Sequence, residues 1–505
     1  MPYKIFSAAP LGLNAEIIEI ETDISRGLGN FIVVGLPDTA VKESRERVRA
    51  AIKNSSLPFP DTRITVNLAP ADIKKEGPLF DLPMALSILL AKNKNFNLKT
   101  DLQSSIFLGE LSLNGEIRPV NGILPIALTA QKNNFSNLFI PEKNASEAGL
   151  IKNINIFPVK TLKQLIEHLT GISSINKLSS KTKIQPLSYP FDFFQIYGQE
   201  SAKRALEIAA AGGHNILLSG PPGSGKTMLA RAFPSILAPL SEEEILECTK
   251  IYSVAGLLSE KRPIITHRPF RSPHHTSSHV AIVGGGAYPR PGEITLAHRG
   301  VLFLDELPEF SRQVLESLRQ PLEDGVITIS RAQNTMEFPA KFTLIAAQNP
   351  CPCGYYTDPD KECACSPAQI IKYRRKISGP LLDRIDLYVE VPKVQPEKLT
   401  SLSQGEPSVD IKKRVQQARQ IQKERFSKEK ILTNSEMTTP QIEKYCSLDS
   451  SSLNFLKQAI NRFNLSARSY FRILKLARTI SDLVQEENIK LEHLAEALQY
   501  RPKSD

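Results

Sequence analysis

The feature that most constrains this fold is a glycine-rich run that directly follows an apolar stretch. The stretch covers residues 215–219, and the run after it reads Gly220-Pro221-Pro222-Gly223-Ser224-Gly225-Lys226-Thr227. This pattern is typical of a phosphate-binding loop between a strand and a helix. In such loops the glycines form the tight turn, the lysine reaches the β- and γ-phosphates and the final hydroxyl ligates Mg²⁺. The sequence therefore predicts an α/β fold that binds ATP with Mg²⁺.

A second apolar run ends in two carboxylates. Residues 300–304 are apolar and are followed by Asp305 and Glu306. A strand buried on both faces has this composition, and ligands bind at the carboxyl ends of such strands. We expect Asp305 to hold Mg²⁺ and Glu306 to deprotonate the attacking water. A third apolar run, 342–347, leads to Asn349, which we expect to sense the γ-phosphate.

These strands, followed by a helix-forming segment, resemble the core of the AAA+ ATPases. Residues 292–300, Gly-Glu-Ile-Thr-Leu-Ala-His-Arg-Gly, resemble the magnesium-chelatase and replicative-helicase branch. Residues 269–275 (Pro-Phe-Arg-Ser-Pro-His-His) and 376–387 (Lys-Ile-Ser-Gly-Pro-Leu-Leu-Asp-Arg-Ile-Asp-Leu) are similar to the YifB/ComM family of bacterial magnesium-chelatase-like ATPases. This resemblance extends over almost the whole chain.

The resemblance assigns roles to two arginines. Arg384 occupies the family position of the arginine finger, which a neighbouring subunit presents to the γ-phosphate. Arg468 matches the second-sensor arginine of the carboxyl-terminal lid. A guanidinium suits both roles because its donors match the charge spread over a transferring phosphoryl group.

The chain divides by composition into four segments. We expect an α+β domain at 1–172, a linker at 173–190, an AAA+ core at 191–393 with a cysteine-rich insertion at 351–365, and a helical lid at 394–505. In the first domain, segments 75–83 and 115–125 resemble the proteolytic domain of Lon. In Lon the first segment carries the nucleophilic serine and the second the activating lysine. Here Leu79 follows Gly77-Pro78 in the first segment, and Leu124 occupies the lysine position in the second. Neither side chain is a nucleophile or a base. We therefore expect a Lon-like domain without peptidase activity.

Four of the six cysteines lie within the insertion, as Cys351, Cys353, Cys363 and Cys365. Two close pairs separated by a short loop can surround a tetrahedral Zn²⁺ ion with sulfur. Each pair has a single intervening residue, where zinc ribbons usually have two to four, so free thiols or a redox role stay open. Four sulfur ligands would make the zinc structural.

Two features suggest contact with nucleic acid. The net charge is +10, and basic residues recur at 372–376 and 412–425. The second run has helical spacing, and its basic face either is solvated or contacts DNA. Because this AAA+ branch lines its ring pore with inserts before the acidic strand, Arg271, His274 and His275 are candidates for DNA contact. The alternative for the histidines is a packing role or a metal site.

The family resemblance implies a ring-forming, hexameric ATPase that acts on DNA by branch migration or helicase activity in recombination during natural transformation. The alternatives are a chelatase-type motor, or a Lon-like ATPase that remodels proteins. No apolar run is long enough to span a bilayer and the first residues lack a signal-peptide pattern, so we expect a cytoplasmic protein. Translocation polarity, preferred DNA structure and loading partner are not encoded in any recognisable motif.

Overall fold

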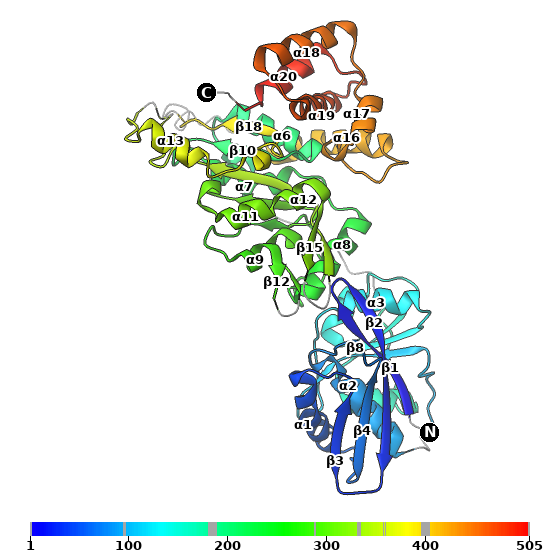
Figure 1. Ribbon diagram of the computed structural model, residues 1–505. Helices are drawn as coiled ribbons and strands as arrows, with labels where there is room; N and C mark the ends of the chain where they lie inside the picture. Colours follow the sequence, from blue (N-terminus) through cyan, green and yellow to red (C-terminus); the bar gives the residue numbers. More distant parts are fainter. Residues whose placement is uncertain are drawn as a thin grey trace. The chain divides into compact units, whose positions relative to one another are not determined.

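The computed structural model describes residues 3–93, 97–179, 189–286, 289–330, 335–356, 358, 360–394 and 405–502. They form two compact units (Figure 1). The first comprises the described residues up to 179 together with Glu242–Thr266, and the second comprises the other described residues. Within these described segments, no helix is both long and apolar enough to cross a bilayer.

The first unit is built on a mixed seven-stranded sheet with the order β3-β4-β2-β1-β5-β8-β9. Its strands are β1 (Tyr3–Leu11), β2 (Asn14–Ser25), β3 (Asn30–Val34), β4 (Arg63–Ala69), β5 (Ser105–Phe107), β8 (Asn137–Pro141) and β9 (Asn155–Val159). Strand β4 illustrates how one face of the sheet becomes buried. Its apolar residues Ile64, Val66 and Leu68 are buried and alternate with less buried residues. Such a period of two buries one face of a strand.

Helices complete the core of the first unit. They are α1 (Thr39–Asn54), α2 (Asp81–Lys92), α3 (Ile123–Lys132), the short α4 (Ala145–Ala148) and α5 (Leu162–Thr170). Helix α1 begins where Asp38 accepts a hydrogen bond from the backbone of Val41 at 2.7 Å. Leu79 and Leu124 are both buried in this core, consistent with apolar packing at these positions.

The sequence predicts that residues 242–266 belong to the core at 191–393, but the structure places them in the first unit. Helix α8 (Glu242–Ala255) lies in the first unit, against α3. The carbonyl of Ser253 accepts from the backbone of Gly122 at 3.1 Å, and its hydroxyl accepts from the backbone of Leu124 at 3.3 Å. The amino end of α3 is therefore capped by a segment from the middle of the chain.

The second unit contains a parallel five-stranded sheet with the order β11-β14-β17-β10-β18. These strands are β11 (Phe270–Arg271), β14 (Val301–Leu304), β17 (Thr343–Gln348), β10 (Ile216–Ser219) and β18 (Leu387–Glu390). The apolar strands predicted before the phosphate loop, the acidic pair and Asn349 are β10, β14 and β17. Since β10 lies between β17 and β18, its carboxyl end is the point where strand order reverses, which is where ligands bind in open α/β sheets.

Helices and one hairpin surround this sheet. They are α6 (Glu200–Gly212), α7 (Lys226–Ala232), α9 (His279–Val283), α10 (Glu293–Leu296), α11 (Arg312–Ser317), α12 (Arg319–Asp324), α13 (Pro367–Arg374), α14 (Gly379–Leu382) and the hairpin of β15 (Val326–Ser330) with β16 (Thr335–Pro339). The carboxyl-terminal helices form the predicted lid (Figure 1). They are α16 (Ser408–Arg425), α17 (Thr439–Tyr445), α18 (Ser450–Phe463), α19 (Ala467–Leu483) and α20 (Leu491–Gln499).

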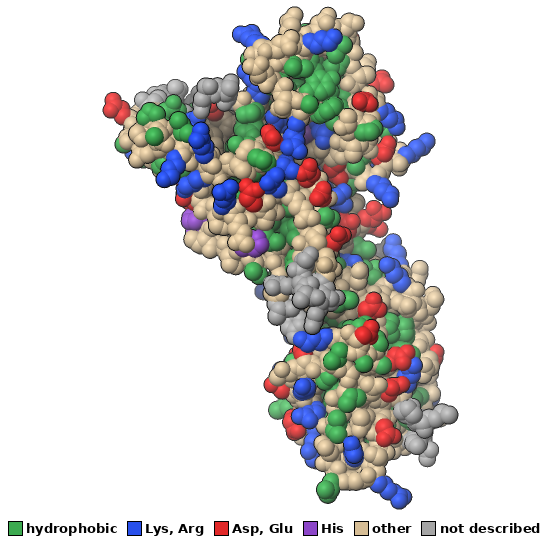
Figure 2. Space-filling view, in the orientation of Figure 1, with side chains coloured by type: hydrophobic (Ala, Val, Ile, Leu, Met, Phe, Trp, Pro, Cys, Tyr) green, Lys and Arg blue, Asp and Glu red, His purple; other side chains and the backbone are tan. Residues whose placement is uncertain are grey.

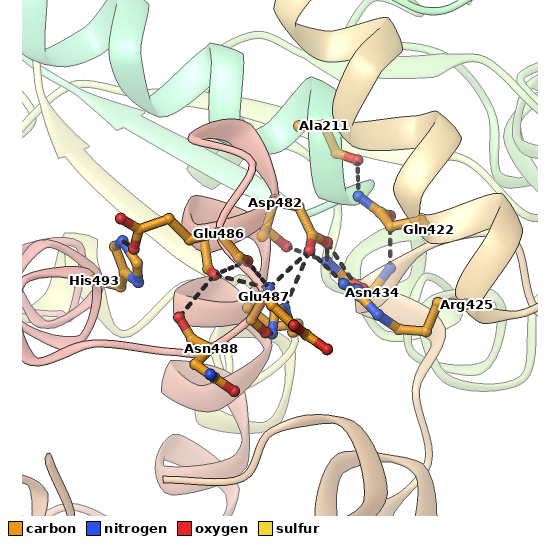
Figure 3. A network of polar contacts seen from close by, with 12 residues as sticks. Ala211, Gln422, Arg425, Asn434, Asp482, Glu486, Glu487, Asn488 and His493 are labelled. Carbon is orange, nitrogen blue, oxygen red and sulfur yellow. Dashed lines mark hydrogen bonds and ion pairs between the residues drawn. The ribbon is translucent and has the colours of Figure 1, made fainter. Parts of the chain in front are cut away.

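A buried polar network joins the carboxyl-terminal helices to the part of the second unit that holds the parallel sheet (Figure 3). Asp482 is fully buried and accepts hydrogen bonds from Arg425 at 2.8 Å and Asn434 at 2.8 Å. Gln422 donates to the carbonyl of Ala211, at the end of α6, at 3.0 Å. Buried polar groups that are satisfied in this way fix a single packing arrangement. The lid is therefore held to the core by specific contacts as well as by apolar packing.

Candidate functional site

The phosphate loop connects β10 to α7, as predicted, and Lys226 is the first residue of the helix. Its ammonium donates to the carbonyls of Gly220 at 2.7 Å and Pro221 at 2.9 Å, and to Oδ1 of Asn349 at 3.3 Å. Burial lowers the pKa of this ammonium, while Asp305 and Glu306 act in the opposite direction. The loop thus holds the Lys226 ammonium at its centre through carbonyl and amide oxygens, and phosphate oxygens could replace these acceptors.

The loop also has the shape that a triphosphate requires. Gly223 and Gly225 have φ of +77° and +92°, and a Cβ on either would meet no described atom within 4 Å. Ser224 Oγ is buried and has no hydrogen-bond partner among the described residues. Gly220 is instead tightly enclosed, because a Cβ there would lie 2.1 Å from the carbonyl oxygen of Val391. An open turn with a spare buried donor fits a polyanionic ligand.

The acidic pair at the end of β14 faces the loop. Thr227 Oγ1 donates to Asp305 Oδ2 at 2.8 Å, and the backbone of Glu306 donates to Asp305 Oδ1 at 3.0 Å. A hydroxyl and a carboxylate held together in this way are oxygen ligands of the type that Mg²⁺ prefers. Residues Lys226, Thr227, Asp305 and Asn349, which come from three strand ends, therefore lie in one cluster.

Glu306 has a geometry suited to a reacting group. Its φ is +52°, a left-handed conformation that is uncommon outside glycine, and its side chain is half exposed. Such strained residues cluster at active sites. Oε2 of Glu306 lies 3.4 Å from Nδ1 of His275. Sequence patterns gave no indication of this contact, because the two residues are thirty-one positions apart on different segments.

Of the residues considered for DNA contact, His275 belongs to that pair and His274 lies next to it. Arg271 binds both carboxylate oxygens of Glu293 at 2.6 Å, so its charge is already paired. His274 is exposed and stacks on His275 with ring centroids 4.1 Å apart. Figure 2 shows histidine side chains on the surface of the second unit, and Lys and Arg side chains near α13.

The predicted basic helix is α16, and its arginines turn inward. Arg414 pairs with Glu207 at 2.5 Å, Arg419 donates to the carbonyl of Ala210 at 2.8 Å, and Arg425 pairs with Asp482. Arg414 and Arg419 hold α16 to α6, and Arg425 holds it to α19 within the lid. They are therefore not a free basic surface, and the structure favours the packed helix over a continuous DNA-contact face.

The two predicted phosphate-sensing arginines share one ion-pair partner, Glu323, and the ion pairs described for them include no residue of the phosphate loop. Arg384 pairs with Glu323, and Arg468 lies 3.5 Å from Glu323 and 3.6 Å from Asp383. Burial lowers the pKa of Arg384, and the charges of Arg468 and Arg319 lower it further. The backbone is fixed as well, because Asn215, directly before β10, donates to the carbonyl of Arg384 at 3.0 Å.

The four cysteines of the insertion also converge. Their ligand atoms lie within 4.8 Å of one another, and Cys351, Cys353 and Cys363 have sulfur–sulfur distances of 3.3, 3.7 and 3.6 Å. Four sulfurs bound tetrahedrally to zinc at about 2.3 Å lie about 3.8 Å apart, so this cluster fits the ion. The remaining cysteines, Cys248 and Cys446, are buried separately.

This cysteine cluster is adjacent to the phosphate site. Cys351 follows Asn349 by two residues, and Gly354 packs on the phosphate loop so closely that a Cβ there would lie 2.7 Å from the ring of Pro222. The insertion therefore packs directly on the phosphate loop.

A phosphate loop on a parallel five-stranded sheet, an acidic strand end, a polar third strand end and a helical lid together define an AAA+ ATPase. Three family models match the chain: "Subunit ChlI of Mg-chelatase" at residues 20–144, "Magnesium chelatase, subunit ChlI" at 192–399, and its carboxyl-terminal model at 405–501.

Full-length relatives narrow the assignment. The chain is 44% identical to the competence protein ComM of Haemophilus influenzae, over 98% of this chain and 97% of that protein. It is 43% identical to YifB of Escherichia coli, over 98% of this chain and 96% of that protein. A weaker similarity, 26% identity over 39% of this chain and 40% of that protein, links it to Lon protease 2 of Bacillus subtilis. The chain belongs to the ComM/YifB family of magnesium-chelatase-like AAA+ ATPases.

Proposed function

We propose that this protein is a ring motor, expected to be hexameric, that uses ATP hydrolysis between subunits to move branched or single-stranded DNA. The observation that carries the proposal is the cluster of Lys226, Thr227, Asp305 and Asn349, with the half-exposed Glu306 beside it. Binding alone needs no carboxylate beside the γ-phosphate, whereas hydrolysis needs a base that can orient water.

Each residue has a defined task in this mechanism. Lys226 exchanges its carbonyl partners for phosphate oxygens, and the backbone N–H groups of the loop, which Pro221 and Pro222 lack, enclose the phosphates. Thr227 and Asp305 would hold Mg²⁺, which neutralises charge on the phosphates when bound. Glu306 takes the proton from water, with His275 limiting the rotation of its carboxylate. Asn349, whose Oδ1 accepts from Lys226, would sense the γ-phosphate.

The second half of the site would come from the neighbouring subunit. Arg384 and Arg468 both pair with Glu323 and not with the phosphate loop of their own chain. This arrangement supports a seam in which one subunit supplies the phosphate loop and the next supplies the arginines. Head-to-tail contacts of this kind close into rings.

The DNA substrate is inferred from the relatives and from charge. One relative is named a competence protein, and the chain carries a net charge of +10. We infer branch migration of recombination intermediates during DNA uptake, with His274 and neighbouring residues of the 269–279 segment as the contacts. We also infer that Cys351, Cys353, Cys363 and Cys365 bind structural zinc.

The test is movement of a labelled strand out of a synthetic four-way junction with ATP and Mg²⁺. The proposal predicts displacement by the parent protein and none by Glu306→Gln, which should still bind ATP and the junction. ATPase rates with the junction, an unfolded protein or a porphyrin-binding partner provide the comparison. Stimulation by unfolded protein, with a junction that is bound but never moved, would contradict the proposal.

A further inference from the structure

The side chain of Arg384 is closed into its own subunit. It is only 11% exposed, its Nη1 donates to the carbonyl of Pro380 at 2.7 Å, and its Nη2 pairs with Glu323. Its Nε is buried and has no hydrogen-bond partner among the described residues. A guanidinium that is to meet the γ-phosphate of another subunit must present these donors outward. The arrangement in this structure is therefore a retracted one.

Glu323 is the group that holds the retracted arrangement. Its two oxygens face different arginines, Oε2 toward Arg384 and Oε1 toward Arg468 at 3.5 Å. The carboxylate is 52% exposed on α12, so it can leave both partners without being buried unpaired. Arg319 on the same helix adds a third cation nearby but has its own partner, Glu316, at 2.9 Å.

We propose that Glu323 is an intrasubunit latch that competes with the γ-phosphate of the neighbouring subunit for Arg384 and Arg468. This inference rests on the proposed function, because it requires that these arginines act across a seam. A carboxylate and a phosphoryl group offer the same oxygen acceptors to a guanidinium fork. Occupation of the neighbouring site by ATP would draw both arginines from Glu323, and loss of the γ-phosphate would return them.

The latch lowers the apparent affinity of the seam for ATP. Only the fraction of subunits with released arginines can complete the neighbouring site, so the observed dissociation constant is the intrinsic one divided by that fraction. Because the pair is partly exposed, we expect its removal to tighten ATP binding by about two- to fivefold. ADP lacks the group that the arginines would meet, so its binding should not change.

The experiment measures nucleotide binding directly in the full chain. ATP and ADP dissociation constants are compared for Glu306→Gln and for Glu306→Gln combined with Glu323→Gln, with Mg²⁺. Measurements are made above and below the protein concentration at which sedimentation shows assembly. Glu316→Gln in the same background is the matched control, because it breaks a partly exposed pair with Arg319 instead of the pair with Arg384. Circular dichroism and thermal unfolding verify that each variant is folded.

We expect the Glu323→Gln change to tighten ATP binding only in the assembled protein, with ADP binding and the Glu316→Gln control unchanged. Unchanged or weaker ATP binding in the assembled protein would overturn the latch, as would an equal gain for ADP. Arg384→Ala in the same background separates the two ideas. If it binds ATP as tightly as its parent when assembled, the seam is wrong. If it binds more weakly while Glu323→Gln changes nothing, only the latch is wrong.

Discussion

Replacing Gly354 by alanine tests whether the cysteine-rich insertion supports the nucleotide site. Gly354 has φ of +86°, and a Cβ there would lie 2.7 Å from both Cγ and Cδ of Pro222. Two carbons prefer a separation of at least about 3.5 Å, so the insertion or the phosphate loop would have to move by about 0.8 Å. The proline ring is rigid and cannot swing away as a long side chain would.

The expected cost has two parts. Left-handed backbone costs a residue with a Cβ about 1–2 kcal/mol relative to glycine, and overpacking adds about 1–3 kcal/mol. The steric part falls on Pro222, while Cγ of Asn349, at 3.9 Å from the same position, is in ordinary van der Waals contact and is the next atom the displaced loop would meet. If the overpacking energy of about 1–3 kcal/mol is subtracted from the stabilisation of the transition state at the nucleotide site, kcat/KM for ATP falls by about 5- to 150-fold.

Steady-state ATPase assays measure this loss, with Gly171→Ala as the control. Gly171 also has positive φ, +76°, but the atoms near its Cβ belong to the flexible end of Lys99. The control should lose about 1–2 kcal/mol of stability in the first unit, from the same left-handed backbone cost, and keep its kcat/KM. If Gly354→Ala keeps its zinc and its kcat/KM remains within twofold of the parent, the insertion does not shape the site and the reasoning is refuted.

Two further predictions concern zinc and pH. Cys363→Ser should lose bound zinc, measured by elemental analysis, and should have lower thermal stability and lower ATP affinity. The control Cys248→Ser should keep its zinc. A full complement of zinc in Cys363→Ser would contradict the site. Burial raises the pKa of the Glu147 carboxyl to about 7. The stability that this carboxyl contributes to the folded state is fully present below the unfolded pKa near 4.5 and is lost as pH rises through about 7. The free energy of unfolding that is lost is on the order of 3 kcal/mol. Glu147→Gln should therefore stabilise the first unit at pH 8 and flatten its pH dependence, measured by hydrogen exchange of its core amides; an unchanged pH profile would contradict this assignment.

The convergence of the phosphate loop, Asp305 and Asn349 could be predicted from sequence because the patterns that indicate them are local. The phosphate loop is eight consecutive residues, and Asp305 and Asn349 each follow an apolar run that reads as a buried strand. Parallel strands bring their carboxyl ends to one edge, so three short patterns were enough to assemble the site. The fold class was confirmed for the same reason, since each domain has its own strand and helix periodicity.

Contacts between distant segments could not be predicted. Nothing in residues 242–266 indicates that they pack with the first unit, because an amphipathic helix does not specify which apolar surface it will cover. The basic residues of 412–425 suggested a charged surface, but several of those arginines bind partners on α6 and α19. The pairing of Arg384 with Glu323 is of the same kind, since only the tertiary fold brings α12 to the segment after α14.

The central claim is that each ATP is split at a seam between two copies of the chain, and mixing two inactive variants tests it most directly. Lys226→Ala lacks a working phosphate loop but keeps Arg384, and Arg384→Ala has the opposite defect. If the two halves belong to different subunits, equal mixing should restore ATPase activity to about a quarter of the parental rate, because each seam needs an intact half from each neighbour. If the mixture stays as inactive as its separate components under conditions where sedimentation shows mixed assemblies, the account is contradicted.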